Sequence, residues 1–384
     1  MKIVFLSNYF NHHQKPLSDA LYRMTDKYLF VATAQMSEER KRLGYQTPEA
    51  AYVVYLDDAS RRAEITTAIE EADAVILGSA PPELVRKRLK SGKLVFRYSE
   101  RLIKHKDASW KYPLQRLKWG RNNPRKAQLY LLCAGAFVAA DYAAYGLLRG
   151  NAFRFGYFPQ TVKYPDFSDL LKKKKPASLL WVGRFLSWKH PELAVKAVKA
   201  LKDSGFDVTL DMIGTGGEEA TVKKMICSYR LEDRVRLLGA MPYDKVRGYM
   251  EQAEIFLCTS DQQEGWGAVI NEAMNSGCAV AASHNIGAVP YLLEDGKNGE
   301  VFECGNLTML TEKLVLLLNN PGLRAQMSVN AYHTVTELWN AEVAAERLLK
   351  VVEMIQKGKP ANELFAEGPC SSAGILSDSW KDRC

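Results

Sequence analysis

Two glutamates, Glu264 and Glu272, stand eight positions apart in residues 259–283, a segment whose pattern predicts a strand, a turn, a helix and a second strand. Gly265 and Gly267 permit a tight turn with close backbone approach. A helix that begins near Gly267 points its first unpaired N–H groups out of the strand end, which favours anion binding. Both carboxylates could then face one ligand with phosphates at the helix terminus. The alternative is structural, with Glu264 as a helix-dipole partner and Glu272 solvated.

The surrounding pattern predicts the elements that must position these residues. Short runs rich in β-branched and aromatic residues alternate with segments of helical period, which indicates strand–helix–strand units around parallel sheets. The predicted strands are 3–6, 29–33, 53–56, 74–77, 94–98, 136–140 and 153–158, followed by 179–182, 208–213, 235–238, 255–258 and 279–282. We therefore predict the α/β class with two doubly wound, Rossmann-like domains, whose ligands bind beyond the carboxyl ends of the strands.

The domain boundaries follow from composition. Residues 160–178 contain two prolines and the run Lys172 to Lys175, and they present no apolar face to bury. We expect a linker over 161–176 between a first domain at 1–160 and a second at 177–338. Residues 339–356 are expected to form a C-terminal helix that crosses back to the first domain. Residues 357–384, rich in Gly, Pro and Ser, are expected to be a disordered tail.

The overall composition excludes several classes of protein. With 47% hydrophobic and 25% charged residues, the 384-residue chain resembles ordinary globular proteins. No run approaches the about 18 apolar residues of a membrane span, and no cleavage-site pattern follows the first apolar stretch. The seven cysteines lack CxxC spacing, which argues against a disulfide framework or a zinc site. We therefore expect a cytoplasmic protein.

The segment Glu264-GWGAVIN-Glu272 resembles the Glu-x7-Glu motif of the family 4 retaining glycosyltransferases, which have the GT-B fold. The resemblance continues through the segments that begin at Trp181, Val208 and Val235, in the family's order. It implies two Rossmann-like domains facing across a cleft, the first binding the acceptor and the second the nucleotide-sugar. The implied activity is that of a retaining hexosyltransferase.

The resemblance also implies roles for individual residues of the second domain. Arg184 and Lys189 match the basic pair that binds the donor pyrophosphate, Glu264 the contact to the hexose, and Glu272 the contact to the ribose hydroxyls. Cations suit the first role because negative charge develops on the departing diphosphate. The other expected donor-binding residues are Gly183, Gly214, Leu238, Met241, Gly265, Trp266, Gly267 and Ala268. No Asp-x-Asp triplet is present, so we expect neither a bound metal nor any other cofactor.

The first domain departs from the family pattern at two places. Asn11, His12 and His13 replace the paired glycines of the loop after the first strand, so this loop either contacts an acceptor or phosphate or forms a solvated turn. Glu100 stands where many family members have a histidine at a strand end. It could act as a nucleophile or base, and we expect instead that it positions the sugar or the acceptor.

A basic segment suggests a further partner. Residues 1–160 hold 26 Lys and Arg against 15 Asp and Glu, and the stretch from Arg101 to Lys126 alone has nine basic residues against the single acid Asp107. Aromatic residues are interleaved with these cations between Trp110 and Trp119, as in amphipathic helices at anionic membranes. Three interpretations stay open: peripheral docking at the inner face of a membrane, capture of a charged soluble acceptor, and an ordinary core-packing helix.

The leading hypothesis is therefore a retaining glycosyltransferase with a nucleotide-sugar donor and a glycan or lipid-linked acceptor, as in polysaccharide biosynthesis. A GT-B enzyme of another reaction type, such as a sugar-nucleotide epimerase, is the alternative within the fold. A basic nucleic-acid-binding protein would explain the charge of the first half. It would leave Glu264, Glu272, Arg184 and Lys189 without a role, and no nucleic-acid motif is present. We expect no nucleic acid as partner.

Overall fold

The computed structural model describes residues 1–37, 47–103, 127–147 and 150–377, together with Pro113, Leu117 and Trp380. These residues form two compact units. Unit 1 comprises the described residues up to Gln160 and from Trp339 onward, and unit 2 comprises Thr161–Leu338. Most of the basic stretch from Arg101 to Lys126 lies outside the described residues, and so does the interleaved aromatic segment except for Pro113 and Leu117.

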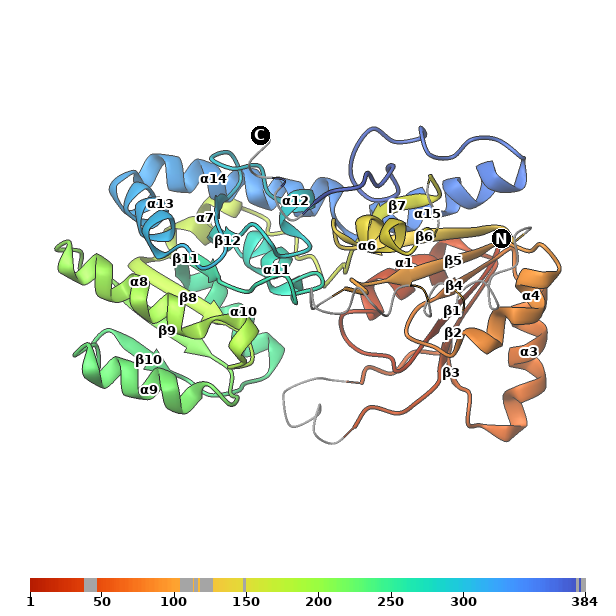
Figure 1. Cartoon of the computed structure of the whole chain (residues 1–384), viewed down its shortest axis with the longest axis horizontal. Coiled ribbons are helices and arrows are strands. Elements are labelled where there is room, and N and C mark those ends of the chain that lie inside the picture. The colour runs from red at the N-terminus through yellow and green to blue at the C-terminus, as the bar shows by residue number, and fades with distance from the viewer. Residues whose placement is uncertain are drawn as a thin grey trace. The chain divides into compact units, whose positions relative to one another are not determined.

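Unit 1 is built on a parallel sheet that has seven strands in the described residues, in the order β3-β2-β1-β4-β5-β6-β7 (Figure 1). Its strands are β1 (Lys2–Ser7), β2 (Lys27–Ala32), β3 (Val53–Tyr55), β4 (Ala74–Leu77), β5 (Val95–Ser99), β6 (Leu129–Ala134) and β7 (Ala152–Phe155). Its helices are α1 (Lys15–Met24), η1 (Ala59–Arg61), α3 (Arg62–Glu71), η2 (Pro82–Val85), α4 (Arg86–Lys90), α6 (Val138–Ala144) and α15 (Ala341–Gln356).

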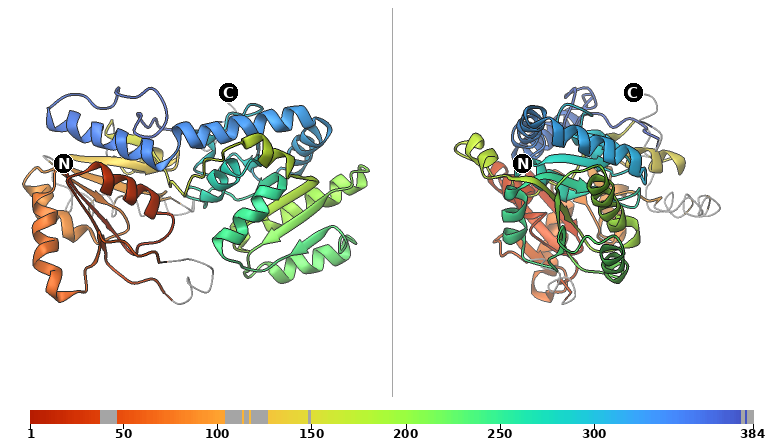
Figure 2. Two further views of the ribbon diagram at one scale, coloured as in Figure 1. Left: turned by 180° about the vertical axis from the view of Figure 1, so that it is seen from behind. Right: turned by 90° about the vertical axis from the view of Figure 1, so that its left-hand side faces the viewer.

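Both faces of this sheet are buried, which explains why the sequences of its strands are nearly continuous apolar runs. Val4 and Leu6 of β1 share one core cluster with Ile65 of α3. The alternate residue Phe5 points to the opposite face, where its ring lies 5.1 Å from that of Phe30. Helix α15 packs against α1 (Figure 2). Arg23 of α1 forms an ion pair with Glu342 of α15 across that contact. The helix after residue 338 is thus part of unit 1.

Unit 2 repeats the architecture with six described strands in the order β10-β9-β8-β11-β12-β13. Its strands are β8 (Lys175–Val182), β9 (Thr209–Ile213), β10 (Val235–Leu237), β11 (Ala253–Cys258), β12 (Ala279–Ser283) and β13 (Glu300–Phe302). Its helices are α7 (Phe167–Lys172), η4 (Ser187–Lys189), α8 (Pro191–Asp203), α9 (Glu219–Ser228), α10 (Tyr243–Gln252), α11 (Ala268–Asn275), α12 (Val289–Leu292), α13 (Leu307–Asn319), α14 (Pro321–His333) and the π-helical turn η5 (Thr334–Leu338). All its strand pairs are parallel, so the functional loops gather at one edge of the sheet.

The segment 161–176, expected to be a linker that buries nothing, is part of unit 2. It contains α7, whose Leu170 is buried, and it ends inside β8, which begins at Lys175. The ammonium group of Lys174 donates to the carbonyls of Met250 at 2.8 Å and Ser276 at 2.6 Å. The expectation was wrong because a lysine can bury its chain while its charge satisfies helix-terminal carbonyls.

The tail from residue 357, expected to be disordered, is ordered and packs onto unit 1 as far as Ala373, whereas Ile375 is exposed. Ser372 forms an antiparallel bridge with Phe153 of β7, the edge strand of the sheet. On either side, Cys370 N donates to Arg154 O at 2.7 Å and Ala373 N donates to Ala152 O at 2.9 Å. Composition did not reveal this segment because backbone pairing to an open sheet edge needs no apolar pattern.

The predicted strand at 136–140 is also wrong. The strand lies earlier, at β6, and Gly135 with φ 133° turns the chain into helix α6. Alanine-rich residues favour a helix once a strand has ended at a glycine turn.

No helix within the described residues is long and apolar enough to cross a membrane.

Removing the packed tail should destabilise unit 1. A chain that ends at Gly358 loses the backbone hydrogen bonds to β7 and the buried Cys370, and at about 1 kcal/mol for each bond we expect a loss of about 2–4 kcal/mol. Urea unfolding monitored by circular dichroism should show an earlier transition. A chain that ends at Ser377 is the control, and equal stability of the two chains would contradict this role of the tail.

Candidate functional site

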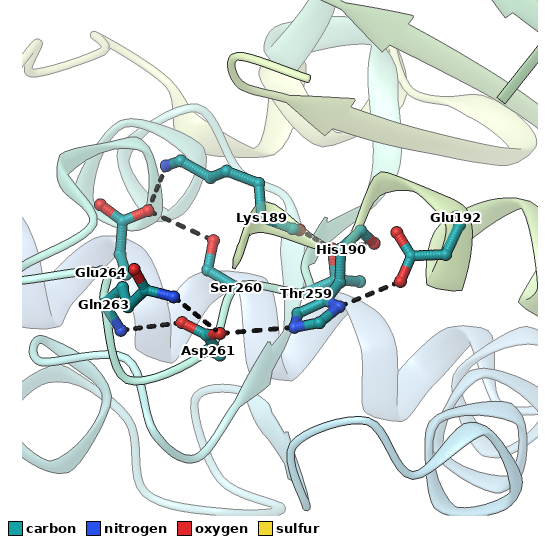
Figure 3. Close-up of polar contacts among 8 residues, drawn as sticks. All are labelled: Lys189, His190, Glu192, Thr259, Ser260, Asp261, Gln263 and Glu264. Carbon is teal, nitrogen blue, oxygen red and sulfur yellow. Dashed lines mark hydrogen bonds and ion pairs between the residues drawn. The ribbon is translucent and has the colours of Figure 1, made fainter. Parts of the chain in front are cut away.

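The candidate site of unit 2 is formed by loops at the carboxyl ends of neighbouring strands. Strand β8 pairs with β11, so the loop that leads to Lys189 lies beside the loop that carries Glu264 (Figure 3). The Lys189 ammonium and the Glu264 carboxylate form an ion pair, and each side chain is 13% exposed. Ser260 donates a further hydrogen bond to Glu264 at 3.2 Å. The structure therefore joins a cation and a carboxylate that are 75 residues apart in sequence.

Several buried contacts hold the two loops together. The Thr259 hydroxyl lies 2.7 Å from the carbonyl oxygen of Lys189 and 2.9 Å from that of His190. It also accepts a hydrogen bond from the Trp181 indole at 3.0 Å. Asp261 N donates to Trp188 O at 2.9 Å. Sequence reasoning missed Thr259, His190 and Asp261 because their partners lie on a different strand-end loop.

A glycine turn starts the helix beside this pair. Gly267 has φ 91° and forms the N-cap of α11, so the first-turn amides follow directly after the Glu264 loop. A side chain at Gly267 would place its Cβ 2.9 Å from the side chain of Ile286, and the positive φ adds strain. Gly265 and Trp266 are buried, whereas Ala268 is half-buried. The predicted turn and helix start thus occur where the sequence placed them.

The loops after β8, β9 and β10 meet around Gly214. Gly214 N donates to Gly239 O at 2.8 Å, and Gly183 N donates to Ile213 O at 3.0 Å. Gly214 has φ 129°, and a Cβ there would lie 1.9 Å from the carbonyl oxygen of Gly183. The half-buried side chains of Leu238 and Met241 belong to the loop that contains Gly239. These predicted donor residues therefore gather at one end of the sheet.

Glu272 lies in the second turn of α11 and is 4% exposed. Burial raises the pKa of its carboxyl to about 7, and the positive charge of Arg247 acts in the opposite direction. The Arg247 guanidinium donates to Asn275 Oδ1 at 2.9 Å and to the Tyr243 hydroxyl at 2.6 Å. A buried glutamate beside a fixed arginine can accept hydrogen bonds from ligand hydroxyls without competition from solvent. The sequence did not single out Arg247 or Tyr243.

Arg184 is the predicted site residue that the structure leaves apart. Its side chain is exposed and, among the described residues, pairs with neither Glu264 nor Asp261. It follows β8 directly, in a loop whose next residue, Phe185, donates its N–H to Thr215 O at 2.9 Å. Its position at the strand end leaves the guanidinium available to an anion.

In unit 1 the predicted residues lie at the carboxyl ends of β1 and β5. The Asn11 side chain accepts from His13 N at 2.9 Å, which makes a turn before α1. The rings of His12 and His13 lie 4.0 Å apart, and burial lowers the pKa of both, that of His13 to about 3 with a contribution from His12. Both histidines are therefore neutral hydrogen-bonding groups at pH 7. Glu100 accepts from the Tyr157 hydroxyl at 2.7 Å.

Among the residues with a described position, no cluster of three or more His, Cys, Asp or Glu could hold a metal ion.

The Glu272 carboxyl should make stability depend on pH. Because the folded state holds its proton more tightly than the unfolded chain, the stability it contributes is complete below pH 4.5 and is lost as the pH rises through 7. Glu272→Gln should therefore gain about 2–3 kcal/mol relative to the wild type between pH 4 and pH 8. Urea titrations at both pH values measure this. Glu312→Gln, at an exposed position of α13, should show no such gain. If the stability difference between Glu272→Gln and the wild type is the same at pH 4 and pH 8, the raised pKa of Glu272 is contradicted.

Residues 163–334 match the family described as Glycosyl transferases group 1. Among curated proteins, the amylovoran biosynthesis glycosyltransferase AmsK of Erwinia amylovora is 28% identical over 53% of this chain and 51% of its own length. An uncharacterized glycosyltransferase of Haemophilus influenzae is 32% identical over 41% of this chain and 44% of its own length. The aligned region thus spans about half the length of these curated relatives.

Solved structures share the fold over 92% of the chain. Alr3699/HepE of Anabaena in complex with UDP superposes with a TM-score of 0.69 at 18% identity and covers 92% of this chain and 100% of its own. The pneumococcal O-GlcNAc transferase GtfA in complex with UDP and GlcNAc gives 0.67 at 12% identity, with 92% and 99% covered. These likenesses confirm the predicted class, two Rossmann-like α/β domains. The chain thus has a GT-B fold, and its residues 163–334 match the glycosyl transferases group 1 family.

Proposed function

We propose that this protein is a glycosyltransferase that moves a sugar from a nucleotide-sugar donor to an acceptor hydroxyl. The observation that carries the proposal is the Lys189–Glu264 pair at the start of α11, inside the region that matches the group 1 glycosyltransferases. A cation and helix amides beside a carboxylate suit a ligand that has both phosphates and hydroxyls. Since HepE and GtfA were each crystallised with UDP, a UDP-sugar is the donor we propose first.

In this proposal the chain's own groups supply the charge stabilisation. Lys189, Arg184 and the first amides of α11 receive the negative charge that develops on the β-phosphate as the diphosphate leaves. Glu264 accepts hydrogen bonds from hydroxyls of the transferred hexose, and the buried Glu272 accepts them from the ribose. The Leu238 to Met241 loop holds the base. Protein cations do the work that a divalent metal does in other enzymes, so we propose that transfer needs no metal.

We further propose that the reaction retains the anomeric configuration. The carboxylates of unit 2 are assigned to hydroxyl contacts, which leaves the departing phosphate to take the acceptor proton from the same face. Glu100 accepts a hydrogen bond from Tyr157, which favours a positioning role over that of a free base or nucleophile. Glu100→Gln should therefore keep measurable activity. An inverted product by NMR, or a glycosylated Glu100 peptide by mass spectrometry, would overturn this mechanism.

The acceptor is proposed to be a glycan or lipid-linked precursor. AmsK carries amylovoran biosynthesis in its name, which supports an acceptor of the polysaccharide type. The eight basic residues from Lys104 to Lys126 would bring the protein to an anionic membrane surface from the cytoplasm, where such an acceptor is available. Arg101, at the start of the same stretch, is buried and pairs with Asp141, so it has no part in this contact. Sedimentation with vesicles containing anionic lipid tests this part separately, and vesicles of neutral lipid are the control.

A thermal-shift screen with UDP-, GDP- and ADP-sugars tests the donor, each with EDTA and with Mg²⁺. A donor at 100 times its dissociation constant stabilises by about 2.7 kcal/mol. We expect one nucleotide series to stabilise the protein equally with and without metal, and to be consumed when an acceptor glycan is added. Stabilisation that requires Mg²⁺ would refute metal independence. Absence of any shift with all three series would refute the proposed function.

A further inference from the structure

His190, the residue after Lys189, has a backbone conformation that histidine adopts at a cost. Its φ of 48° and ψ of 51° are left-handed, and it forms the N-cap of α8, which begins at Pro191. Glycine adopts this conformation without a steric cost, whereas other residues are uncommon there, histidine less so than most. A side chain kept at such a position suggests that the side chain has a role of its own.

The imidazole ring of His190 contacts carboxylates from two different elements (Figure 3). Nδ1 lies 3.0 Å from Glu192 Oε1 on its own helix, and Nε2 lies 3.6 Å from Asp261 Oδ2 on the loop after β11. A neutral imidazole has one N–H and no charge, whereas the protonated ring donates to Glu192 and forms an ion pair with Asp261. The protonated ring is therefore the form that links α8 to the Glu264 loop.

Asp261 connects His190 to Glu264, the residue that contacts the sugar in the proposed function. Its side chain accepts from Gln263 N at 2.8 Å, and its carbonyl accepts from Glu264 N at 3.1 Å. These bonds shape the turn that carries the Glu264 carboxylate. On the other side, His190 is bonded covalently to Lys189. The His190 ring therefore connects the backbone segment that carries Lys189 with the turn that carries Glu264.

We propose that His190 is a positioning residue whose protonated ring holds Lys189 and Glu264 in their transfer geometry, so that turnover falls when the ring loses its proton. The inference rests on the proposed function, because it concerns the same two residues. His190 itself touches neither sugar nor phosphate in this proposal. It acts through Asp261 and through the backbone of Lys189.

The surroundings of the ring favour the protonated form. The hydrogen bond with Glu192 raises the pKa of His190, partial burial opposes this, and the charges of Glu192 and Asp261 raise it further. Among the other charged groups of these elements, Lys196 acts on Glu192, and Lys189 is paired with Glu264. Because the folded pKa is raised, the stabilising contacts are complete below about pH 6.5 and are lost as the pH rises through the folded value.

Two variants separate the ring from the backbone conformation. His190→Gly removes the side chain and relieves the left-handed strain, and His190→Asn keeps a polar side chain that tolerates this conformation but carries no charge. We expect both variants to lose the alkaline limb of the kcat–pH profile and to have a kcat at pH 6 at least about tenfold below the wild type. The apparent affinity for UDP, measured by thermal shift, should stay within threefold of the wild-type value, because the phosphate-binding groups remain.

A third variant tests the link through the turn. Asp261→Asn keeps the oxygen that accepts from Gln263 N but removes the charge beside Nε2. The alkaline limb should then move to lower pH without disappearing. The ring resonances of His190, assigned by their absence in His190→Asn, should titrate above pH 6.5 in the wild type and at lower pH in Asp261→Asn. This NMR measurement does not depend on activity.

The outcomes distinguish failure of this inference from failure of the proposed function. A wild type that binds UDP and transfers sugar, together with His190→Asn of unchanged kcat and unchanged alkaline limb, would refute the positioning role alone. Ring resonances that titrate below pH 6.5 in the wild type would also refute it. A wild type that neither binds nor consumes any nucleotide-sugar would refute the proposed function first.

Discussion

Lys189→Ala is expected to lower kcat by about 10²–10³-fold while weakening donor binding much less. Lys189 is the cation that the structure places in contact with Glu264 and beside the start of α11. The negative charge that it meets is small in the bound donor and grows as the diphosphate departs. Removing it therefore raises the energy of the transition state more than that of the ground state.

Steady-state kinetics and a separate measurement of UDP affinity check this expectation. Lys199→Ala is the matched control, because Lys199 lies on the neighbouring helix α8 and pairs with Asp203 in an exposed i,i+4 contact worth well under 1 kcal/mol. It should keep wild-type kcat. In Lys189→Ala the Glu264 carboxylate loses its cation and keeps only the hydrogen bond from Ser260 among the contacts described above. Thermal unfolding of both variants shows whether this loss destabilises the fold. An unchanged kcat with only a raised KM would show that Lys189 merely binds the donor.

Gly214→Ala is expected to destabilise unit 2 by about 3 kcal/mol or more and to abolish UDP binding. The new Cβ would lie 1.9 Å from the carbonyl oxygen of Gly183, and φ is 129°, which an alanine rarely adopts. Relief requires the loops after β8 and β9 to separate, and Gly183 N is bonded to Ile213 O between those loops. Because these loops carry the predicted donor residues, the substitution affects stability and binding together.

Gly217→Ala is the matched control, since an added Cβ there meets no atom within 4 Å. For a unit of this size, a loss of 3 kcal/mol corresponds to a melting temperature lower by about 6–12 °C. Differential scanning calorimetry with and without UDP measures both effects. If Gly214→Ala melts like Gly217→Ala and still binds UDP, the close approach of the two loops is not needed for the site.

The sequence alone determined the class of fold and the local geometry of the Glu-x7-Glu segment. Both are encoded by near neighbours in the chain: apolar runs that predict buried parallel strands, and Gly267 placed where a helix can begin at a strand end. The same local signals misplaced a strand at 136–140, because the turn at Gly135 comes before it. They also missed the packed C-terminal tail, whose backbone pairing with β7 leaves no trace in composition.

Only the tertiary structure decided which of these residues meet. The order β10-β9-β8-β11-β12-β13 sets β8 beside β11, and this pairing places Lys189 against Glu264 and His190 beside Asp261. No local pattern contains the pairing of β8 with β11, because β9 and β10 lie between these two strands in sequence. Burial likewise raises the pKa of Glu272 to about 7, since the apolar environment of α11 disfavours its charge. Contacts between distant segments and loss of solvent are properties of the packed chain.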